Sequence, residues 1–257
     1  MPILHRLNDG IAVLSLELGR GNAIDPPFID ALHASLDEVE RSDARALVIT
    51  GKGRVFCGGL DLVTLYGFDA AGMDRFVAAL DGIFRRVFAF ERPTVAAVNG
   101  HALAGGCILA MACDRRVMAD GPYQIGLNEA QLGIPFPAAP FEIACQATPT
   151  AARSATIVQG RRYSPVAAHA AGLVHRLGAG GGALEDALDD ARLFAALGPA
   201  AARAVKAELV APVLARIDAT AAPRRARFLE HWFSPEARAR IGALREELLA
   251  RHKPAAP

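Results

Sequence analysis

The chain has 257 residues, of which 52% are hydrophobic and 21% are charged. This apolar content can offset the entropy lost on folding, which excludes a largely disordered chain. The 28 basic and 27 acidic residues leave a net charge of +1. The balance indicates neither a nucleic acid nor an anionic membrane surface as a partner.

Short apolar runs bounded by turn residues predict strands that are covered on both faces. They lie at 10–18, 46–50, 94–98 and 116–119. Between them, apolar residues recur with the helical period over 28–39 and 73–88, and Pro93 prevents the second helix from continuing. Strands that alternate with helices in this way predict an α/β fold with right-handed crossovers.

The composition changes after about Gly178. Residues 178–182 read GAGGG, and the chain beyond them is rich in Ala, Arg, Leu and Glu. This composition predicts helices only, one of which starts at Ser234-Pro235-Glu236. We therefore divide the chain into an α/β core at 1–180 and a helical C-terminal region at 181–257.

The cysteines form no CxxC pair and have no histidine-rich ligand spacing around them. They are Cys57, Cys107, Cys113 and Cys145. We expect reduced, mostly buried thiols and no metal site. The first ten residues lack a basic region followed by a long apolar run, so we expect no signal peptide and a cytoplasmic protein.

One uncharged stretch, from Pro93 to Cys113, has the length of a membrane span. It contains Asn99, His101 and several glycines, which a span would disfavour. We interpret it as a buried strand, a tight turn and a buried helix.

Three segments have the composition of a reactive site. Residues 51–62 (GKGRVFCGGLDL) and 97–113 (AVNGHALAGGCILAMAC) each place a glycine-rich loop between a predicted strand and a predicted helix. Glycines let the backbone approach a ligand, and free N–H groups at a helix start can hold an anion. Each loop alone is also compatible with ordinary close packing.

The third segment is 123–137 (YQIGLNEAQLGIPFP), in which Glu129 stands among apolar residues. Such surroundings raise the pKa of a carboxyl group, as a general acid or base requires. The alternative is that Glu129 faces solvent or pairs with an arginine. Together, the three segments suggest an oxyanion hole with a base, which suits proton abstraction next to a carbonyl group.

Four runs, in this order, resemble the enoyl-CoA hydratase/isomerase (crotonase) family. They are VFCGGLDL, AVNGHALAGGCILAMACD, IGLNEAQLGIPFP and GRRYSPVAAHAAGLVHRL. The resemblance covers residues 1–180 and includes a short early motif at 22–25 (NAID). It implies a crotonase-like spiral of ββα units with a C-terminal helical trimerisation region, and hence a homotrimer or hexamer.

The resemblance also implies the substrate and the site. The substrate would be an acyl-CoA thioester, with no separate cofactor because coenzyme A is part of the substrate. The N–H groups of Leu60 and Gly105 would bind the thioester oxygen, and Glu129 would be a catalytic glutamate. The residues implied to line the coenzyme A site are Ala23, Ile24, Gly58, Gly59, Asp61 and Leu62.

The sequence departs from the hydratase pattern at Ile108, where the hydratases of this family carry a second glutamate. Two carboxylates hold the water that a hydratase adds, whereas one base suffices to move a proton between C2 and C4. We therefore expect an enoyl-CoA isomerase. The alternatives are a hydratase that uses a single glutamate and a non-catalytic acyl-CoA-binding trimer.

Other polar residues have structural interpretations. We expect Asp61 to fix its loop, Asp114 to be structural and His101 to be packed or to act as a cap. Glu142 could reach the pocket as a second acid, but a surface position is favoured. Neither Cys57 nor Cys107 has an activating base nearby in the sequence, which argues against a nucleophilic thiol.

Overall fold

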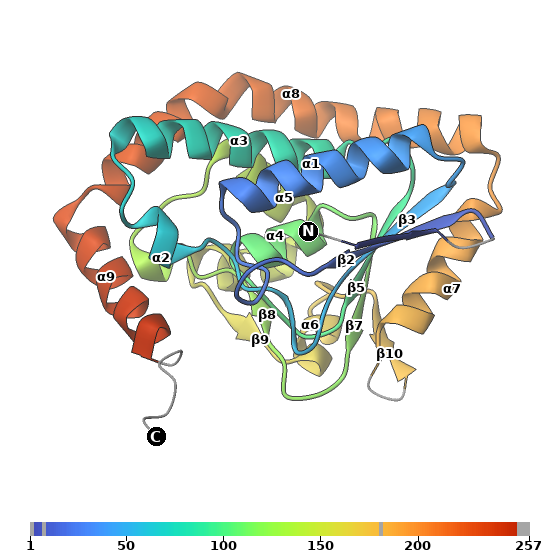
Figure 1. Ribbon diagram of the computed structural model, residues 1–257, viewed down its shortest axis with the longest axis horizontal. Helices are drawn as coiled ribbons and strands as arrows, with labels where there is room; N and C mark the ends of the chain where they lie inside the picture. Colours follow the sequence, from blue (N-terminus) through green and yellow to red (C-terminus); the bar gives the residue numbers. More distant parts are fainter. Residues whose placement is uncertain (1–2, 7–8, 180–181, 251–257) are drawn as a thin grey trace.

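Apolar side chains alternate between two buried faces along the strand β2 (Ile11–Leu16). Leu14 and Leu16 pack in one core cluster, and Ile11 and Val13 pack in another. The computed structural model, shown in Figure 1, describes residues 3–6, 9–179 and 182–250. A strand covered on both faces has no polar side to show, which explains the continuous apolar runs in the sequence.

The main sheet has six strands. Their order is β1 (Ile3–Arg6), β2, β3 (Ala46–Gly51), β5 (Thr94–Val98), β7 (Arg115–Ala119) and β10 (Arg176–Gly178). β1 pairs antiparallel with β2, and the other neighbours are parallel. The predicted strands at 46–50, 94–98 and 116–119 are confirmed to within one residue.

A second, small sheet was not predicted. It contains β4 (Val55–Cys57), β6 (His101–Leu103), β8 (Ile125–Gly126) and β9 (Arg162–Tyr163). Its strands have two or three residues, too few to show a period of two in the sequence. This sheet positions the reactive segments described below.

Helices cover both faces of the main sheet. One layer contains α1 (Pro26–Arg41), α3 (Ala70–Phe88) and α8 (Pro199–Trp232), and α7 (Leu184–Ala195) lies on the other face (Figure 1). Two smaller helices, α4 (Gly105–Met111) and α5 (Ala138–Ala147), complete the core. Asp25 and Asp69 cap α1 and α3, accepting hydrogen bonds from the N–H groups of Phe28 (2.8 Å) and Gly72 (2.7 Å).

Every regular element between residues 182 and 250 is a helix, as predicted: α7, α8 and α9 (Pro235–Ala250). α8 continues past Pro212 and Pro223. The remaining short elements are α2 (Leu62–Leu65), α6 (Pro165–Ala170) and three single turns at Ala130–Leu132, Thr150–Ala152 and Ser154–Val158. α7 packs on the main sheet, and the division of the chain at residue 180 stays a prediction.

The uncharged stretch from Pro93 to Cys113 contains the predicted strand (β5), turn and helix (α4), and also the strand β6, which was not predicted. Within the described ranges, no helix combines the length and the apolar character needed to cross a bilayer. All four cysteines are free thiols. Burial raises the pKa of Cys57 to about 12 and also raises that of Cys107, so neither is a thiolate near neutral pH.

Asp81 joins α3 to the start of α5 and provides a test of stability. Its buried carboxylate accepts a hydrogen bond from the Ala139 N–H (2.8 Å), and burial raises its pKa to about 6. Because this pKa is higher in the folded than in the unfolded chain, stability falls as pH rises from about 4 through 6.

Asp81→Asn keeps an acceptor oxygen but carries no charge. We expect it to raise the free energy of unfolding by about 1–2 kcal/mol at pH 8 and by less at pH 5, measured by urea denaturation. An equal difference at both pH values would show that the carboxylate charge is not the cause.

Candidate active site

Each of the three glycine-rich or Glu129-containing segments follows one of three adjacent parallel strands. β4 lies beside β6, and β6 lies beside β8, with Cys57 opposite Ala102 and Leu103 opposite Gly126. The carboxyl ends of parallel strands meet at one edge of a sheet. The segments that begin at 58 and 104, and the segment that leads to Glu129, therefore leave from the same edge.

The first loop rests directly on the second at Gly59. Gly59 has φ +90°, and a Cβ there would lie 2.8 Å from the Leu103 carbonyl oxygen and 2.9 Å from the Cβ of Ala104. Only glycine accommodates both the left-handed conformation and the contact. The two loops are thus in van der Waals contact.

Residues 22–25 flank the first loop. The Ile24 N–H donates to the Gly59 carbonyl (2.7 Å), and the Asp61 N–H donates to the Ile24 carbonyl (2.9 Å). Leu60 lies between these two bonds, and its N–H has no backbone acceptor in the described part of the chain. The Gly58 N–H donates to the Gly21 carbonyl (2.9 Å).

The structural role of Asn22 was not predicted from the sequence. The residue is buried with φ +53°, a conformation that asparagine tolerates better than most residues. Its side chain accepts from the Leu18 N–H (2.8 Å) and donates to the Phe56 carbonyl (3.0 Å). Asn22 therefore holds Ala23 and Ile24 against β4. The sequence signal for this role was the asparagine itself, a residue that is favoured in turns.

The second loop ends in a strained residue followed by two glycines. Ala104 has φ +49°, and its N–H donates to the Gly126 carbonyl (2.9 Å), which ties this loop to the strand before Glu129. Gly105 is the first residue of α4, so its N–H has no acceptor within the helix. A Cβ at Gly105 would lie 2.9 Å from Cδ1 of Ile24.

Glu129 has the properties predicted from its apolar neighbours. Its side chain is buried, with the residue 9% exposed, and Oε2 has no hydrogen-bond partner among the described residues. Burial raises the pKa of Glu129 to about 7. A carboxyl group with this pKa can both take and return a proton near neutral pH.

Neither position 108 nor position 142 provides a free second acid for Glu129. Ile108 is fully buried in α4. Glu142 is neither on the surface, as favoured from the sequence, nor free: it is buried and pairs with Arg216 (2.7 Å) and Arg224 (3.6 Å) of α8. These two ion pairs join α5 to α8.

The other polar residues have the structural roles expected of them. Asp61 caps α2 through the N–H groups of Val63 and Thr64. His101 accepts from the Gln124 N–H (3.1 Å) and packs edge-on against Tyr123. Across the described residues, no group of three or more His, Cys, Asp and Glu side chains is arranged to hold a metal ion.

The C-terminal helix α9 contacts both sides of this region, which the sequence did not indicate. Arg238 stacks on Tyr66, just after α2, and donates to its carbonyl (3.0 Å). Arg240 donates to the carbonyl of Gln131, two residues after Glu129 (2.9 Å). α9 therefore supports the first loop and the Glu129 segment together.

Comparison with known proteins identifies the family. Residues 6–247 match the family model described as enoyl-CoA hydratase/isomerase. The chain is 34% identical over 131 residues to the rat (Rattus norvegicus) mitochondrial enoyl-CoA delta isomerase 1, an alignment that spans 50% of this chain and 45% of the rat protein. The chain thus spans about half the length of this curated relative.

Two solved structures are similar over most of the chain. The human mitochondrial delta3-delta2-enoyl-CoA isomerase has a TM-score of 0.90 and 26% identity, and the match covers 98% of this chain and 99% of that one. An enoyl-CoA hydratase from Mycobacterium ulcerans has a TM-score of 0.82 and 30% identity, covering 88% and 99%. With its fold, its two touching loops and its buried Glu129, the chain belongs to the enoyl-CoA hydratase/isomerase family of enzymes.

Proposed function

We propose that the enzyme is an enoyl-CoA isomerase that shifts a double bond from C3=C4 to C2=C3 of an acyl-CoA thioester. The observation that carries this proposal is the buried carboxylate of Glu129, whose Oε2 has no partner among the described residues, together with the apolar side chain at Ile108 and the pairing of Glu142 with Arg216. One base that both removes and returns a proton completes this reaction, and no water is added.

Glu129 takes the proton from C2, and the electrons of the broken C–H bond form C1=C2 as the thioester oxygen takes up the negative charge. Glu129 then returns the proton to C4: the C3=C4 electrons form the new C–H bond, the C1=C2 electrons become C2=C3, and the thioester carbonyl is restored. The intermediate is an enolate whose oxygen accepts hydrogen bonds from the N–H groups of Leu60 and Gly105. Donors fixed in a dry site stabilise such an oxyanion strongly. The apolar surroundings of Glu129 limit exchange of its proton with water.

The proposal extends to binding and assembly. Ala23, Ile24 and the loop 58–62 would contact coenzyme A, as the family resemblance implies. Backbone hydrogen bonds beside Leu60 join these two segments. The thioester is the whole substrate, and no separate cofactor is required for a proton shift. We propose that the enzyme is cytoplasmic and forms a homotrimer or hexamer. Light scattering on the purified protein would test the oligomeric state.

The deciding experiment offers purified enzyme a trans-3-enoyl-CoA and a trans-2-enoyl-CoA side by side. We expect the first to give a product of unchanged mass that co-elutes with the 2-enoyl ester, and the second to gain no water. Addition of 18 mass units to the 2-enoyl ester would instead identify a single-glutamate hydratase. Binding of both esters without turnover would identify a non-catalytic acyl-CoA-binding protein.

The pH dependence of turnover tests Glu129 as the base. Because its pKa is raised to about 7, the carboxylate form is lost as pH falls through this value. We expect kcat/KM for the 3-enoyl ester to rise about tenfold per pH unit below 7 and to level off above it. A profile that levels off already at pH 5 would contradict the raised pKa.

A further inference from the structure

Glu129 lies in an irregular segment between two regular elements. The strand β8 ends at Gly126, and the single turn that follows Glu129 ends at Gly133, which has φ +79°. The Glu129 carbonyl accepts hydrogen bonds from the N–H groups of Leu132 (3.0 Å) and Ile134 (3.1 Å). These bonds shape the turn but do not join it to the small sheet. The position of Glu129 therefore depends on contacts that its neighbours in the segment make.

The carboxylate of Glu129 provides little anchoring of its own. Its Oε2 has no hydrogen-bond partner among the described residues. The backbone N–H groups of Asn128 and of Glu129 itself are the donors that oppose the rise in the pKa of Glu129. Both donors belong to the same short segment, so the carboxylate moves when the segment moves.

The side chain of Gln131 joins this segment to a neighbouring loop. Nε2 of Gln131 donates to the carbonyl oxygens of Gln159 (3.2 Å) and Gly160 (3.0 Å), so both hydrogens of the amide are used. Gly160 lies two residues before β9, the strand that pairs with β8. Gln131 therefore closes a ring that runs from β8 through Glu129 to Gln131, across to Gly160 and back through β9.

Gly160 also touches the segment on the other side of Glu129. It has φ +67°, and a Cβ there would lie 3.0 Å from the Leu127 carbonyl oxygen and 3.1 Å from Nε2 of Gln131. Only glycine combines this left-handed conformation with so close a contact. Residues 127 and 131, which flank Glu129, thus rest on the same loop.

The main chain of Gln131 is held as well. Arg240 of α9 donates to its carbonyl (2.9 Å) and pairs with Glu236, one turn earlier in the same helix (2.8 Å). Gln131 is thus bound on two sides, by its side chain to the loop at 159–160 and by its carbonyl to α9. The amide makes the first of these contacts without bringing a charge toward Glu129.

From these contacts, we propose that Gln131 is a positioning residue, which acts through Glu129 by fixing the segment 127–131 against the loop at 159–160. This inference rests on the proposed isomerisation, in which one carboxylate must reach both C2 and C4. A displacement of about 1 Å at such a site can lower a rate by about 10²-fold. A loosened segment would also admit water to the buried carboxylate, which lowers its pKa toward the ordinary value.

Gln131→Met tests the inference, and Gln159→Met is the matched control. Methionine has nearly the shape of glutamine but donates no hydrogen bond, and Gln131 is exposed, so the variant should fold. Gln159 is also exposed and takes part in the contact through its carbonyl, which the substitution retains. We expect kcat for the 3-enoyl ester to fall at least tenfold in Gln131→Met, with KM within twofold. Both constants should stay within twofold in Gln159→Met.

The pKa of Glu129 gives a readout that needs no turnover. Infrared difference spectra across a pH titration follow its carboxyl group, with Glu129→Gln identifying the band. Burial raises this pKa to about 7, and we expect it to fall to about 6 or lower in Gln131→Met, because water reaches the carboxylate. Among the nearby groups, the buried Cys107 of α4 is a neutral thiol, and Arg161 and Arg240 are cations, throughout this pH range.

An unchanged kcat in Gln131→Met, or a lower kcat with the pKa of Glu129 unmoved, would overturn the inference. Equal effects in Gln159→Met would do the same. If the wild-type enzyme isomerises no enoyl ester but the pKa of Glu129 still falls in Gln131→Met, the proposed function is wrong and the positioning role stands. If the wild-type enzyme is active and the pKa does not move, the proposed function stands and the positioning role is wrong.

Discussion

Replacing Glu129 with glutamine is expected to lower turnover of a 3-enoyl-CoA by about 10²–10⁴-fold, the usual contribution of a general acid–base group. Glutamine has nearly the same shape but cannot take a proton from C2. The affinity for the CoA ester should stay within a few-fold, because the loops at 58–62 and 104–105 are unchanged. Stopped-flow turnover and equilibrium binding would be measured on the same preparation.

Glu142→Gln is the matched control, since it removes the other buried glutamate of this region. We expect full turnover and a loss of about 1 kcal/mol in the free energy of unfolding, because the half-exposed Arg216 loses its partner. If Glu142→Gln abolishes turnover as completely as Glu129→Gln, Glu142 acts as a second acid and the one-base reaction is wrong. If Glu129→Gln retains full turnover, the proposed base is wrong.

Gly106→Ala is expected to destabilise the fold by about 3 kcal/mol or more and to abolish activity. A Cβ at Gly106 would overlap the carbonyl oxygen of Cys57, a backbone atom of β4 that cannot move without moving the small sheet. The shift would carry the Gly105 N–H away from Leu60. Urea denaturation and the isomerase assay would measure the two effects.

Gly82→Ala makes the same substitution in α3, where a Cβ would meet no atom within 4 Å. There the added methyl group should stabilise the enzyme by about 0.5–1 kcal/mol, because alanine loses less backbone entropy than glycine in a helix. Similar changes in both variants would show that the contact between α4 and β4 does not limit stability.

Four of the six strands of the main sheet, and the helices α1 and α3, could be predicted from the sequence alone, whereas β1 and β10 were not predicted. The runs at 46–50 and 94–98 are apolar throughout because helices cover both faces of those strands. The stripe at 73–88 is periodic because α3 buries only one side. These patterns are local consequences of burial, so they can be read without knowing the partners.

Part of the candidate site could also be predicted from the sequence. Glu129 could be singled out because burying an isolated acid among apolar residues costs free energy, so its presence there indicates a function. Its pKa is raised, as the apolar neighbours predict. The glycines at 59 and 105 were visible as a pattern. The contact between the two loops could not be predicted. It depends on the pairing of β4, β6 and β8, which are too short to leave a periodic signal in the sequence.

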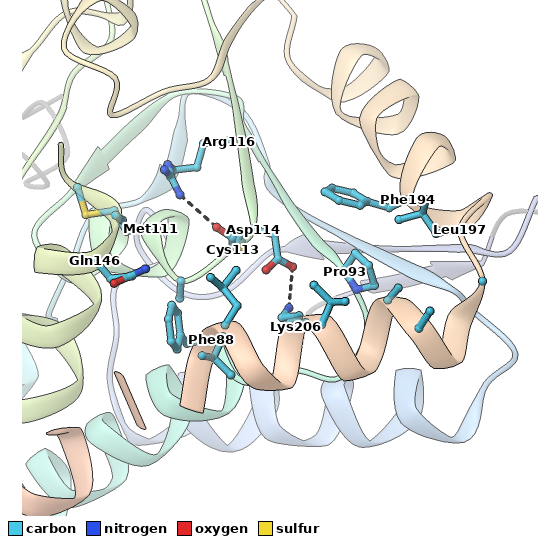
Figure 2. Close-up of a pocket in the computed structure, with 18 residues that line it drawn as sticks. Phe88, Pro93, Met111, Cys113, Asp114, Arg116, Gln146, Phe194, Leu197 and Lys206 are labelled. Carbon is cyan, nitrogen blue, oxygen red and sulfur yellow. Dashed lines mark hydrogen bonds and ion pairs between the residues drawn. The ribbon is translucent and has the colours of Figure 1, made fainter. Parts of the chain in front are cut away.

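The long-range polar contacts could not be predicted from the sequence. Glu142 pairs with Arg216, 74 positions later in the chain, and Lys206 pairs with Asp114, 92 positions earlier (Figure 2). A cavity beside Arg116 is bounded by segments from Phe88 to Val210. A charged residue has the same appearance in the sequence whether it faces water or a buried partner, because its partner is chosen by how helices pack and not by its neighbours along the chain.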